Sequence, residues 1–189
     1  MKAGALPAFI DINEGVSKLS YFCPSIYVNK VTDIDKECLL KHDIRAILLD
    51  IDNTLSPHCA AMPFDGVKEW IDEIKNLNIN LSILTNRSDL KDVEVFAKNL
   101  SLGFVMNAKK PLQSGFNRAI STLNLPRENV LLVGDQIFTD ILGANIAKIK
   151  SALVEPQDKN ESIFIKFKRL FELPFRSAIR YNKKMNAKK

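Results

Sequence analysis

The chain contains few cysteines, few glycines and no long apolar run. Only three cysteines and seven glycines occur among its 189 residues. Cys23, Cys38 and Cys59 are odd in number and show no CxxC spacing, which predicts free thiols in a reducing compartment. No apolar stretch approaches the ~20 residues that cross a bilayer, so a membrane-spanning helix is not expected.

An export signal and a zinc centre are not expected either. The first residues carry Asp11 and Glu14 where a signal peptide would be apolar. His58 and Cys59 are adjacent, but two neighbouring ligands do not complete a tetrahedral zinc site. An apolar content of 46% with 26% charged residues is typical of a globular protein, which we expect to be cytoplasmic.

Positive charge is concentrated at the C-terminal end of the chain. Residues 159–189 hold ten Lys and Arg and two Glu, a net charge of +8. The preceding residues hold 17 basic and 20 acidic side chains, a net charge of −3. This asymmetry predicts an anionic partner for the tail and not for the whole surface.

Short apolar segments alternate with segments of helical periodicity. This alternation predicts an α/β fold, a three-layer doubly wound parallel sheet, over residues 40–156. Residues 1–39 are interpreted as an N-terminal extension that packs on this core, and residues 157–189 as a basic amphipathic tail. The expected strands are 46–49, 81–86, 104–106, 130–133 and 152–154, and the expected helices are 67–77, 89–100, 112–123 and 138–146.

Polar side chains follow four consecutive expected strands. In an extended chain alternate side chains point the same way, so Asp50 and Asp52 are expected to face one spot. Two carboxylates at that range repel each other unless a cation or proton lies between them. Turn chemistry explains any one of these positions, but it does not readily explain all four. The set comprises Asp50, Asp52, Thr85, Asn86, Lys109, Lys110 and Asp135.

These groups are suited to phosphoryl transfer. Carboxylates around a vacancy favour a hard cation such as Mg²⁺, whose coordination a substrate phosphate completes. A carboxylate can attack phosphorus, and a second one can protonate the leaving alcohol and then activate water. A lysine and a hydroxyl group would neutralise the phosphate oxygens.

The same residues resemble the four motifs of the haloacid dehalogenase (HAD) phosphatase superfamily over roughly residues 45–155. That resemblance implies Asp50 as nucleophile and Asp52 as acid/base, with Thr85, Asn86 and Lys110 binding phosphate. It also implies a strand order of 5-4-1-2-3, counting the five expected strands along the chain. The matching segments are Asp50-Ile51-Asp52-Asn53-Thr54, Thr85, Lys110-Pro111 and Gly134-Asp135-x-x-x-x-Asp140.

The resemblance further implies a Mg²⁺ site. Asp50, the backbone carbonyl of Asp52, and Asp135 would hold the ion, with Asp140 supporting them. Lys109 is adjacent to Lys110 and is an alternative for the phosphate-binding lysine; otherwise it is a solvated surface residue.

The closest resemblance within the superfamily is to subfamily IIIA, and to a bacterial group of small phosphatases similar to mitochondrial phosphatidylglycerophosphate phosphatase. Only short connections separate the motifs, so an inserted cap domain is not expected. The resulting open site suits a phosphate carried on something large. We therefore expect conversion of phosphatidylglycerophosphate to phosphatidylglycerol by a peripheral enzyme on the inner membrane face. Phosphoproteins, nucleotides and sugar phosphates are alternative substrates, and a receiver-like domain or a non-catalytic binding module are alternatives of another class.

The tail combines phenylalanines and cations at helical spacing. Ile163, Phe164, Phe167, Leu170 and Phe171 recur at steps of three and four residues, with basic residues between them. A basic amphipathic helix of this kind favours an anionic membrane surface and a lipid head group as partners. Alternatively this face docks on the protein's own core; nucleic acid is the less favoured partner.

Pro174 is expected to break this helix. Removing the tail is expected to impair turnover of a lipid substrate and to leave turnover of a soluble aryl phosphate unchanged.

Overall fold

The computed structural model describes residues 20–158 and 163–186, and in the last helix the side chains of residues 165–181. Short 3₁₀ turns cover Ser20–Phe22, Val31–Asp33 and Arg127–Asn129. The strands are β1 (Ile26–Tyr27), β2 (Ala46–Leu49), β3 (Asn80–Leu84), β4 (Gly103–Val105), β5 (Val130–Gly134) and β6 (Lys150–Leu153). The helices are α1 (Lys36–Lys41), α2 (Val67–Asn76), α3 (Leu90–Asn99), α4 (Gln113–Leu123), α5 (Leu142–Ile146) and α6 (Ile163–Asn186).

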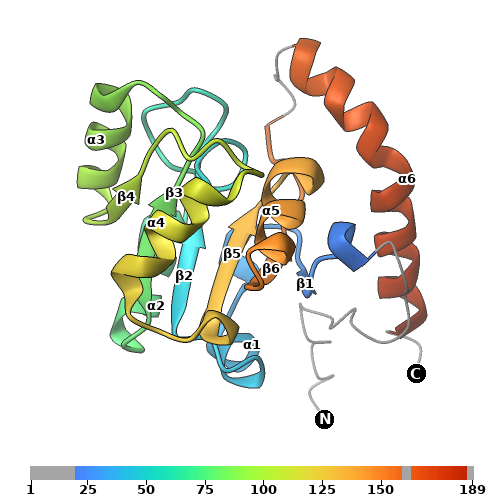
Figure 1. The fold of residues 1–189 in the computed structure, drawn as a ribbon, viewed down its shortest axis with the longest axis horizontal. Coiled ribbons are helices and arrows are strands. Elements are labelled where there is room, and N and C mark those ends of the chain that lie inside the picture. Colours follow the sequence, from blue (N-terminus) through green and yellow to red (C-terminus); the bar gives the residue numbers. More distant parts are fainter. Residues whose placement is uncertain (1–19, 159–162, 187–189) are drawn as a thin grey trace.

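The strands form one parallel sheet in the order β1-β6-β5-β2-β3-β4 (Figure 1). The order of the last five strands confirms the predicted 5-4-1-2-3 arrangement. The edge strand β1 was not expected, because its two residues lie in the segment interpreted as an N-terminal extension. Residues 1–19 of that segment lie outside the described part of the chain, and the proposed domain division stays a prediction.

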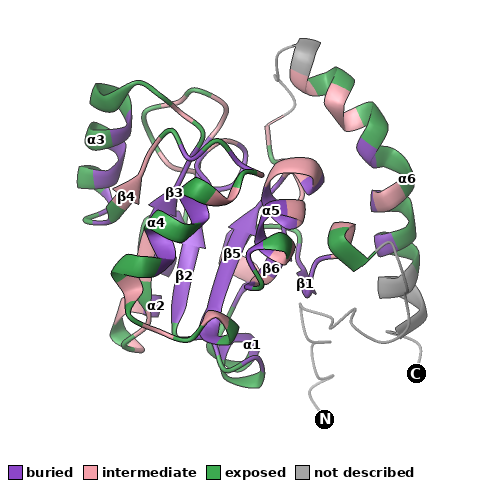
Figure 2. Cartoon of the chain, viewed as in Figure 1, coloured by how far each residue is buried: buried purple, intermediate pink, exposed green. Residues whose placement is uncertain are grey.

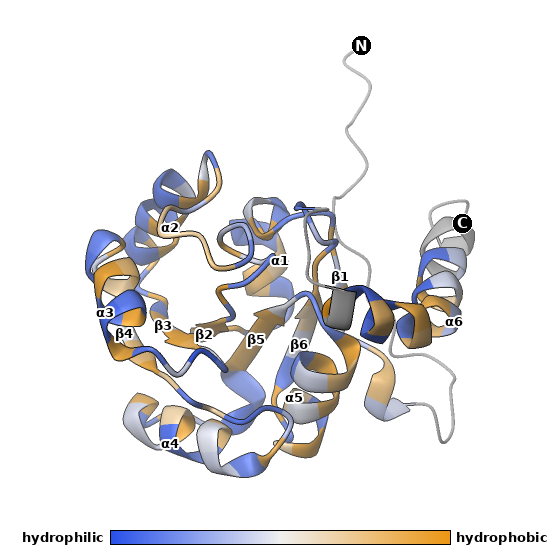
Figure 3. Cartoon of the chain, turned by 90° about the horizontal axis from the view of Figure 1, so that it is seen from above, coloured by the Kyte–Doolittle hydropathy of each residue, from blue (hydrophilic) through white to orange (hydrophobic). Residues whose placement is uncertain are grey.

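Helices cover both faces of the sheet, as Figures 1 and 3 show. Along β2, Ile47 and Leu49 point to the face covered by α1, α2 and α3, whereas Ala46 and Leu48 point to α4 and α5. All four residues of β2 are buried (Figure 2), which explains why the strand is a continuous apolar run rather than an alternating one. The predicted three-layer α/β fold is therefore confirmed.

No cap domain interrupts the chain between Asn86 and Lys109, an interval that the structure describes completely. Only α3 and β4 occupy it. The loop from Asp50 to Gly66, also fully described, contains no helix or strand apart from the single bridge between Asp52 and Ser56. The predicted capless architecture is confirmed.

The C-terminal segment forms one continuous helix, α6, that passes through Pro174. The prediction that Pro174 ends the helix was wrong. Proline deprives the carbonyl of residue i−4, here Leu170, of its helical donor. Because Leu170 and Pro174 both lie on the exposed side of α6, water can satisfy that carbonyl and the helix continues.

Helix α6 lies beside the β1 edge of the sheet (Figures 1 and 3). Ile179 packs in a cluster with Tyr27 of β1 and Leu153 of β6, and Phe175 contacts Phe22 and Phe138. Among the described residues, no helix has the length and apolarity that crossing a bilayer requires.

Candidate active site

The candidate site lies at the carboxyl ends of the central strands. Strand β2 ends at Leu49, and the next residue, Asp50, donates its backbone N–H to Val133 of β5 at 3.0 Å. This bond continues the sheet ladder, so the position of Asp50 is fixed by the sheet and not by a loop. Asp50 as a whole is only 6% exposed.

Lys110 lies between two of the predicted acidic residues. Its Nζ is 2.6 Å from Asp50 Oδ1 and 2.6 Å from Asp140 Oδ1. Lys109 is exposed, so of the two adjacent lysines only Lys110 reaches the acidic cluster. The loop places Lys110 through Asn86, whose amide accepts from the Lys110 backbone N–H at 2.7 Å and donates to its carbonyl at 3.2 Å.

Asp135 follows β5 and is completely buried. The glycine before it is required for packing, because a Cβ at Gly134 would collide with the Asp140 side chain. Asp140 is on a π-helical turn, Ile137–Ile141, that leads into α5, and its Oδ2 accepts from the Gln136 backbone N–H at 3.0 Å. The loop therefore holds both carboxylates beside Asp50.

Burial disfavours the charged forms of Asp50 and Asp135. It raises the pKa of Asp50 well above its ordinary value, although the Lys110 ammonium acts in the opposite direction. It also raises the pKa of Asp135 to about 7, although the Arg169 guanidinium acts to lower it. Lys110 is itself buried, but its two carboxylate partners outweigh that burial and raise its pKa. Three buried acids thus lie together beside the buried Lys110 ammonium.

This arrangement fits a divalent cation. One carboxylate oxygen from each of Asp50, Asp135 and Asp140 lies within 4.8 Å of the others. Asp135 Oδ1 is buried and has no hydrogen-bond partner among the described residues. An oxygen-rich donor set with an unpaired buried oxygen is what a hard cation such as Mg²⁺ requires.

Asp52 lies in a different environment from Asp50. Its carboxylate accepts from Arg87 Nη2 at 2.7 Å and from the Cys59 backbone N–H at 2.9 Å, and His58 Nδ1 is 3.3 Å away. The two carboxylates therefore have different partners, although the Asp52 charge still acts on Asp50 and contributes to its raised pKa. The expectation that both face one spot stays a prediction. The chain turns after Asp50, as the bridge between Asp52 and Ser56 indicates.

Arg87 sets the charge of Asp52. Partial burial acts to raise the pKa of Asp52, but the hydrogen bonds from Arg87 and Cys59 outweigh it and bring the pKa below its ordinary value. Ligand atoms of Asp52, His58 and Cys59 lie within 4.8 Å of one another. Asp52 thus joins His58 and Cys59 as a third possible metal ligand, which the sequence did not reveal. Since Asp52 is already paired with Arg87, we assign no metal there.

Thr85 and Asn86 follow the end of β3, next to this cluster. Thr85 is 1% exposed, and its hydroxyl oxygen accepts from the Arg87 backbone N–H at 3.1 Å. Both polar atoms of the Asn86 amide are engaged by Lys110, so in this structure Asn86 positions the lysine. Its expected contact with phosphate stays a prediction.

Three charged residues of α6 reach the site and were not expected from the sequence. They are Arg169, Glu172 and Arg176, with Glu172 and Arg176 2% and 4% exposed. Arg169 donates to the Asp135 carboxylate and Glu172 accepts from the Ile137 backbone N–H. Their spacing of three and four residues places them on one helix face, a signal that the interleaved phenylalanines obscured.

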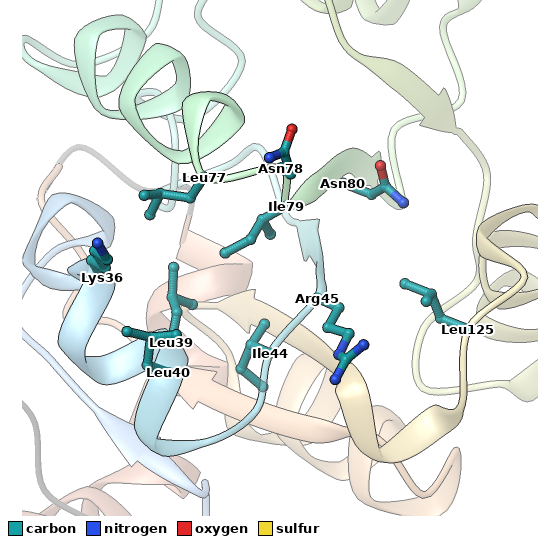
Figure 4. A pocket seen from close by; sticks show the side chains of 10 residues that line it. All are labelled: Lys36, Leu39, Leu40, Ile44, Arg45, Leu77, Asn78, Ile79, Asn80 and Leu125. Carbon is teal, nitrogen blue, oxygen red and sulfur yellow. The ribbon is translucent and has the colours of Figure 1, made fainter.

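A cavity of about 480 Å³ lies elsewhere in the molecule (Figure 4). Arg45 and Asn80, which line it, stand at the amino ends of β2 and β3. Asp50 follows the carboxyl end of β2, whereas this cavity lies at the amino ends of the strands. The cavity is therefore separate from the acidic cluster.

Comparison with known families decides the membership of the chain. Residues 33–154 match the model of the haloacid dehalogenase-like hydrolases. The chain belongs to this family. It is also 30% identical, over 160 residues, to a Bacillus subtilis (strain 168) protein named as the probable phosphatase YqeG, covering 85% of this chain and 92% of that one. Identity to a glyceraldehyde 3-phosphate phosphatase of Pyrococcus abyssi (strain GE5 / Orsay) is 23% over 94 residues, covering 46% of this chain and 40% of the relative.

Solved structures agree on the haloacid dehalogenase-like fold. A protein of Listeria monocytogenes serotype 4b superposes with a TM-score of 0.50 at 20% identity, covering 63% of this chain and 85% of that chain. A protein of Corynebacterium glutamicum ATCC 13032 superposes with a TM-score of 0.50 at 18% identity, covering 59% and 85%. At this identity the likeness concerns the fold alone.

Proposed function

We propose that this haloacid dehalogenase-like hydrolase is a Mg²⁺-dependent phosphomonoesterase that works through a phosphorylated Asp50. The observation that carries the proposal is the contact of Lys110 with Asp50 at the end of β2, beside the buried carboxylates of Asp135 and Asp140. These contacts support the proposal because they join a carboxylate that could attack phosphorus, a lysine that could bind phosphate and acids that could hold a cation. The match to a named probable phosphatase over most of both chains supports the same class of reaction.

In the first half of the proposed reaction an oxygen of Asp50 attacks phosphorus, and the bond from phosphorus to the ester oxygen breaks. Lys110 neutralises charge on the phosphoryl oxygens, and the Thr85 hydroxyl donates to one of them. Asp52 gives a proton to the leaving alkoxide. Arg87 must loosen its hold on Asp52 at this stage, because its hydrogen bonds favour the deprotonated carboxylate.

In the second half Asp52 takes a proton from water, whose oxygen attacks the same phosphorus atom. The bond from phosphorus to Asp50 breaks, inorganic phosphate leaves and both carboxylates return to their starting state. Asp50, the Asp52 carbonyl, Asp135 and Asp140 would hold Mg²⁺, which when bound neutralises charge that develops on the phosphoryl group. A receiver-like domain would not hydrolyse the phosphorylated aspartate rapidly.

For the substrate we propose phosphatidylglycerophosphate at an anionic membrane surface, in line with the resemblance to subfamily IIIA and its phosphatidylglycerophosphate phosphatase group. The support is a stripe on the side of α6 that faces away from the core. It consists of Phe167, Leu170, Phe171 and Tyr181, which are 58%, 58%, 56% and 63% exposed. The predictions for Ile163 and Phe164 concern side chains outside the described residues.

This stripe has the character of an interfacial helix. The rings of Phe167 and Phe171 contact each other at 5.1 Å, and the exposed Lys166 lies near them on the helix. Contiguous exposed apolar residues mark interaction surfaces, and each cation near an anionic bilayer contributes about 1 kcal/mol. The docking of α6 uses its other side, so the stripe is free to bind a bilayer.

A substrate panel tests the lipid proposal. Full-length protein with Mg²⁺ is given phosphatidylglycerophosphate in anionic vesicles, an aryl phosphate, a nucleotide, a sugar phosphate and a phosphopeptide, each with and without EDTA. We expect metal-dependent turnover that is fastest on the lipid. Absence of lipid turnover contradicts the substrate assignment, and absence of any metal-dependent turnover contradicts the phosphatase assignment.

A double variant tests the role of the exposed stripe on α6. Replacing Phe167 and Phe171 with Ser is expected to lower vesicle binding and lipid turnover by about tenfold or more, because two rings no longer enter the interface. Vesicle sedimentation and initial rates measure both effects. Leu40→Ser is the matched control, because Leu40 is 69% exposed on α1. An equal effect of both replacements would contradict the role of the stripe.

A further inference from the structure

Helix α6 contributes a charged triad to the loop that carries Asp135. The triad consists of Arg169, Glu172 and Arg176. Glu172 Oε1 accepts from the Ile137 backbone N–H at 2.7 Å, and its Oε2 accepts from Arg176 Nε at 3.1 Å. The loop after β5 is thus held from outside the sheet by a helix residue that lies 35 positions further along the chain.

Arg169 makes the most direct contact with the candidate metal site. Its Nη1 donates to the Asp135 carbonyl at 2.7 Å, and its Nη2 donates to Asp135 Oδ2. Arg176 also donates to the Asp135 carbonyl. The Arg169 guanidinium therefore donates hydrogen bonds to both the side chain and the backbone of Asp135, which fixes the rotation of the carboxylate.

The consequence for Asp135 concerns its second oxygen. With Oδ2 taken by Arg169, Oδ1 is buried and has no hydrogen-bond partner among the described residues. One oxygen of the Asp135 carboxylate lies within 4.8 Å of an oxygen from each of Asp50 and Asp140. We propose that Arg169 is a positioning residue for the phosphatase reaction: its fork orients Asp135 so that one oxygen faces the cation position. This inference rests on the proposed function, and it makes α6 a part of the catalytic domain.

A purely structural role is the competing explanation. Buried ion pairs cost desolvation energy, and well-packed apolar residues would stabilise the loop equally well. The triad incurs that desolvation cost at Asp135, one of the three buried acids that form the candidate cation site. A second explanation is that Arg169 competes with the cation, since a positive charge close to the site repels another positive charge.

The sign of a change in Mg²⁺ affinity separates these explanations. The experiment is a calorimetric titration of full-length protein with Mg²⁺ in the absence of substrate. Arg169→Gln is expected to weaken Mg²⁺ binding by about 10- to 100-fold, the usual effect of losing a group that orients a ligand. Removal of the Arg169 charge alone would tighten Mg²⁺ binding. Weaker Mg²⁺ binding by the folded variant would therefore reflect lost orientation of the Asp135 carboxylate.

Two further variants complete the test. Arg169→Lys keeps the charge and loses the fork, and we expect Mg²⁺ affinity between those of the wild type and Arg169→Gln. Lys91→Gln, an equal charge change at an exposed position of α3, is the control that should leave affinity unchanged. If Arg169→Gln does not fold, Arg169→Lys carries the test, with circular dichroism establishing that it is folded.

Unchanged or tighter Mg²⁺ binding by the folded Arg169 variants would overturn the positioning role. Wild-type protein that binds no Mg²⁺ would instead contradict the proposed function itself. The two failures are therefore distinguishable in one set of titrations.

Discussion

Replacing Asp50 with Asn is expected to lower turnover of a soluble aryl phosphate by at least about 10³-fold, because loss of a nucleophile removes the covalent route. The amide is similar in size and carries no charge, and burial already disfavours the charged form of Asp50. We therefore expect Asp50→Asn to remain folded. Initial rates under saturating Mg²⁺ measure the effect, and thermal unfolding establishes the fold.

The control for this variant is Asp72→Asn, which makes the same chemical change at an exposed position of α2. It should keep wild-type turnover. Full activity in Asp50→Asn would show that another group attacks phosphorus and would contradict the nucleophile assignment.

Ending the chain after Asp158 is expected to abolish turnover of both soluble and lipid phosphomonoesters. Removal of α6 deprives the buried Asp135 of Arg169 and exposes Tyr27 and Leu153. Leaving a buried charge without its ion-pair partner costs about 3–5 kcal/mol. This is a large part of the free energy of unfolding of a typical domain, which is about 5–15 kcal/mol. We expect a much lower unfolding midpoint in denaturant together with the loss of turnover.

A chain that ends after Tyr181 is the matched comparison. It loses Lys183, Lys184, Lys188 and Lys189 but keeps Arg169, Glu172 and Arg176, so turnover of an aryl phosphate and stability should be retained. Wild-type aryl phosphate turnover by the chain ending at Asp158 would contradict the role of α6 described here. The sequence alone had suggested that result, because it treated the tail as a membrane anchor outside the catalytic domain.

Most of the sheet could be predicted because its strands are buried on both sides. The apolar runs at residues 46–49 and 130–133 can only be satisfied between two layers of helices. The polar residues that follow them therefore had to meet at one edge, and this is where Asp50, Lys110 and Asp135 lie. Strand β1 could not be predicted in this way, because two residues, Ile26 and Tyr27, carry too little periodicity.

The partners of the acidic residues were harder to predict from the sequence. Arg87 follows Thr85 by two residues in the loop after β3, but nothing local in the sequence shows that it binds Asp52. Arg169 meets Asp135 across 34 positions of sequence. Apolar periodicity identified the helix of the tail correctly, but it left open whether the face with Phe167 and Phe171 binds a membrane or docks on the core. The structure buries Glu172 and Arg176 instead, since Asp135 and the loop N–H groups supply their partners.

The most direct test of the central claim is to trap the phosphorylated enzyme in Asp52→Asn. An aryl phosphate has a good leaving group, so attack by Asp50 proceeds without a proton donor, whereas hydrolysis of the intermediate still requires a base to activate water. After acid quenching and proteolysis, we expect mass spectrometry to find one phosphoryl group on the peptide that contains Asp50. No adduct should form in the Asp50→Asn/Asp52→Asn double variant. A phosphoryl group on any other residue, or an adduct that persists in the double variant, would contradict the mechanism.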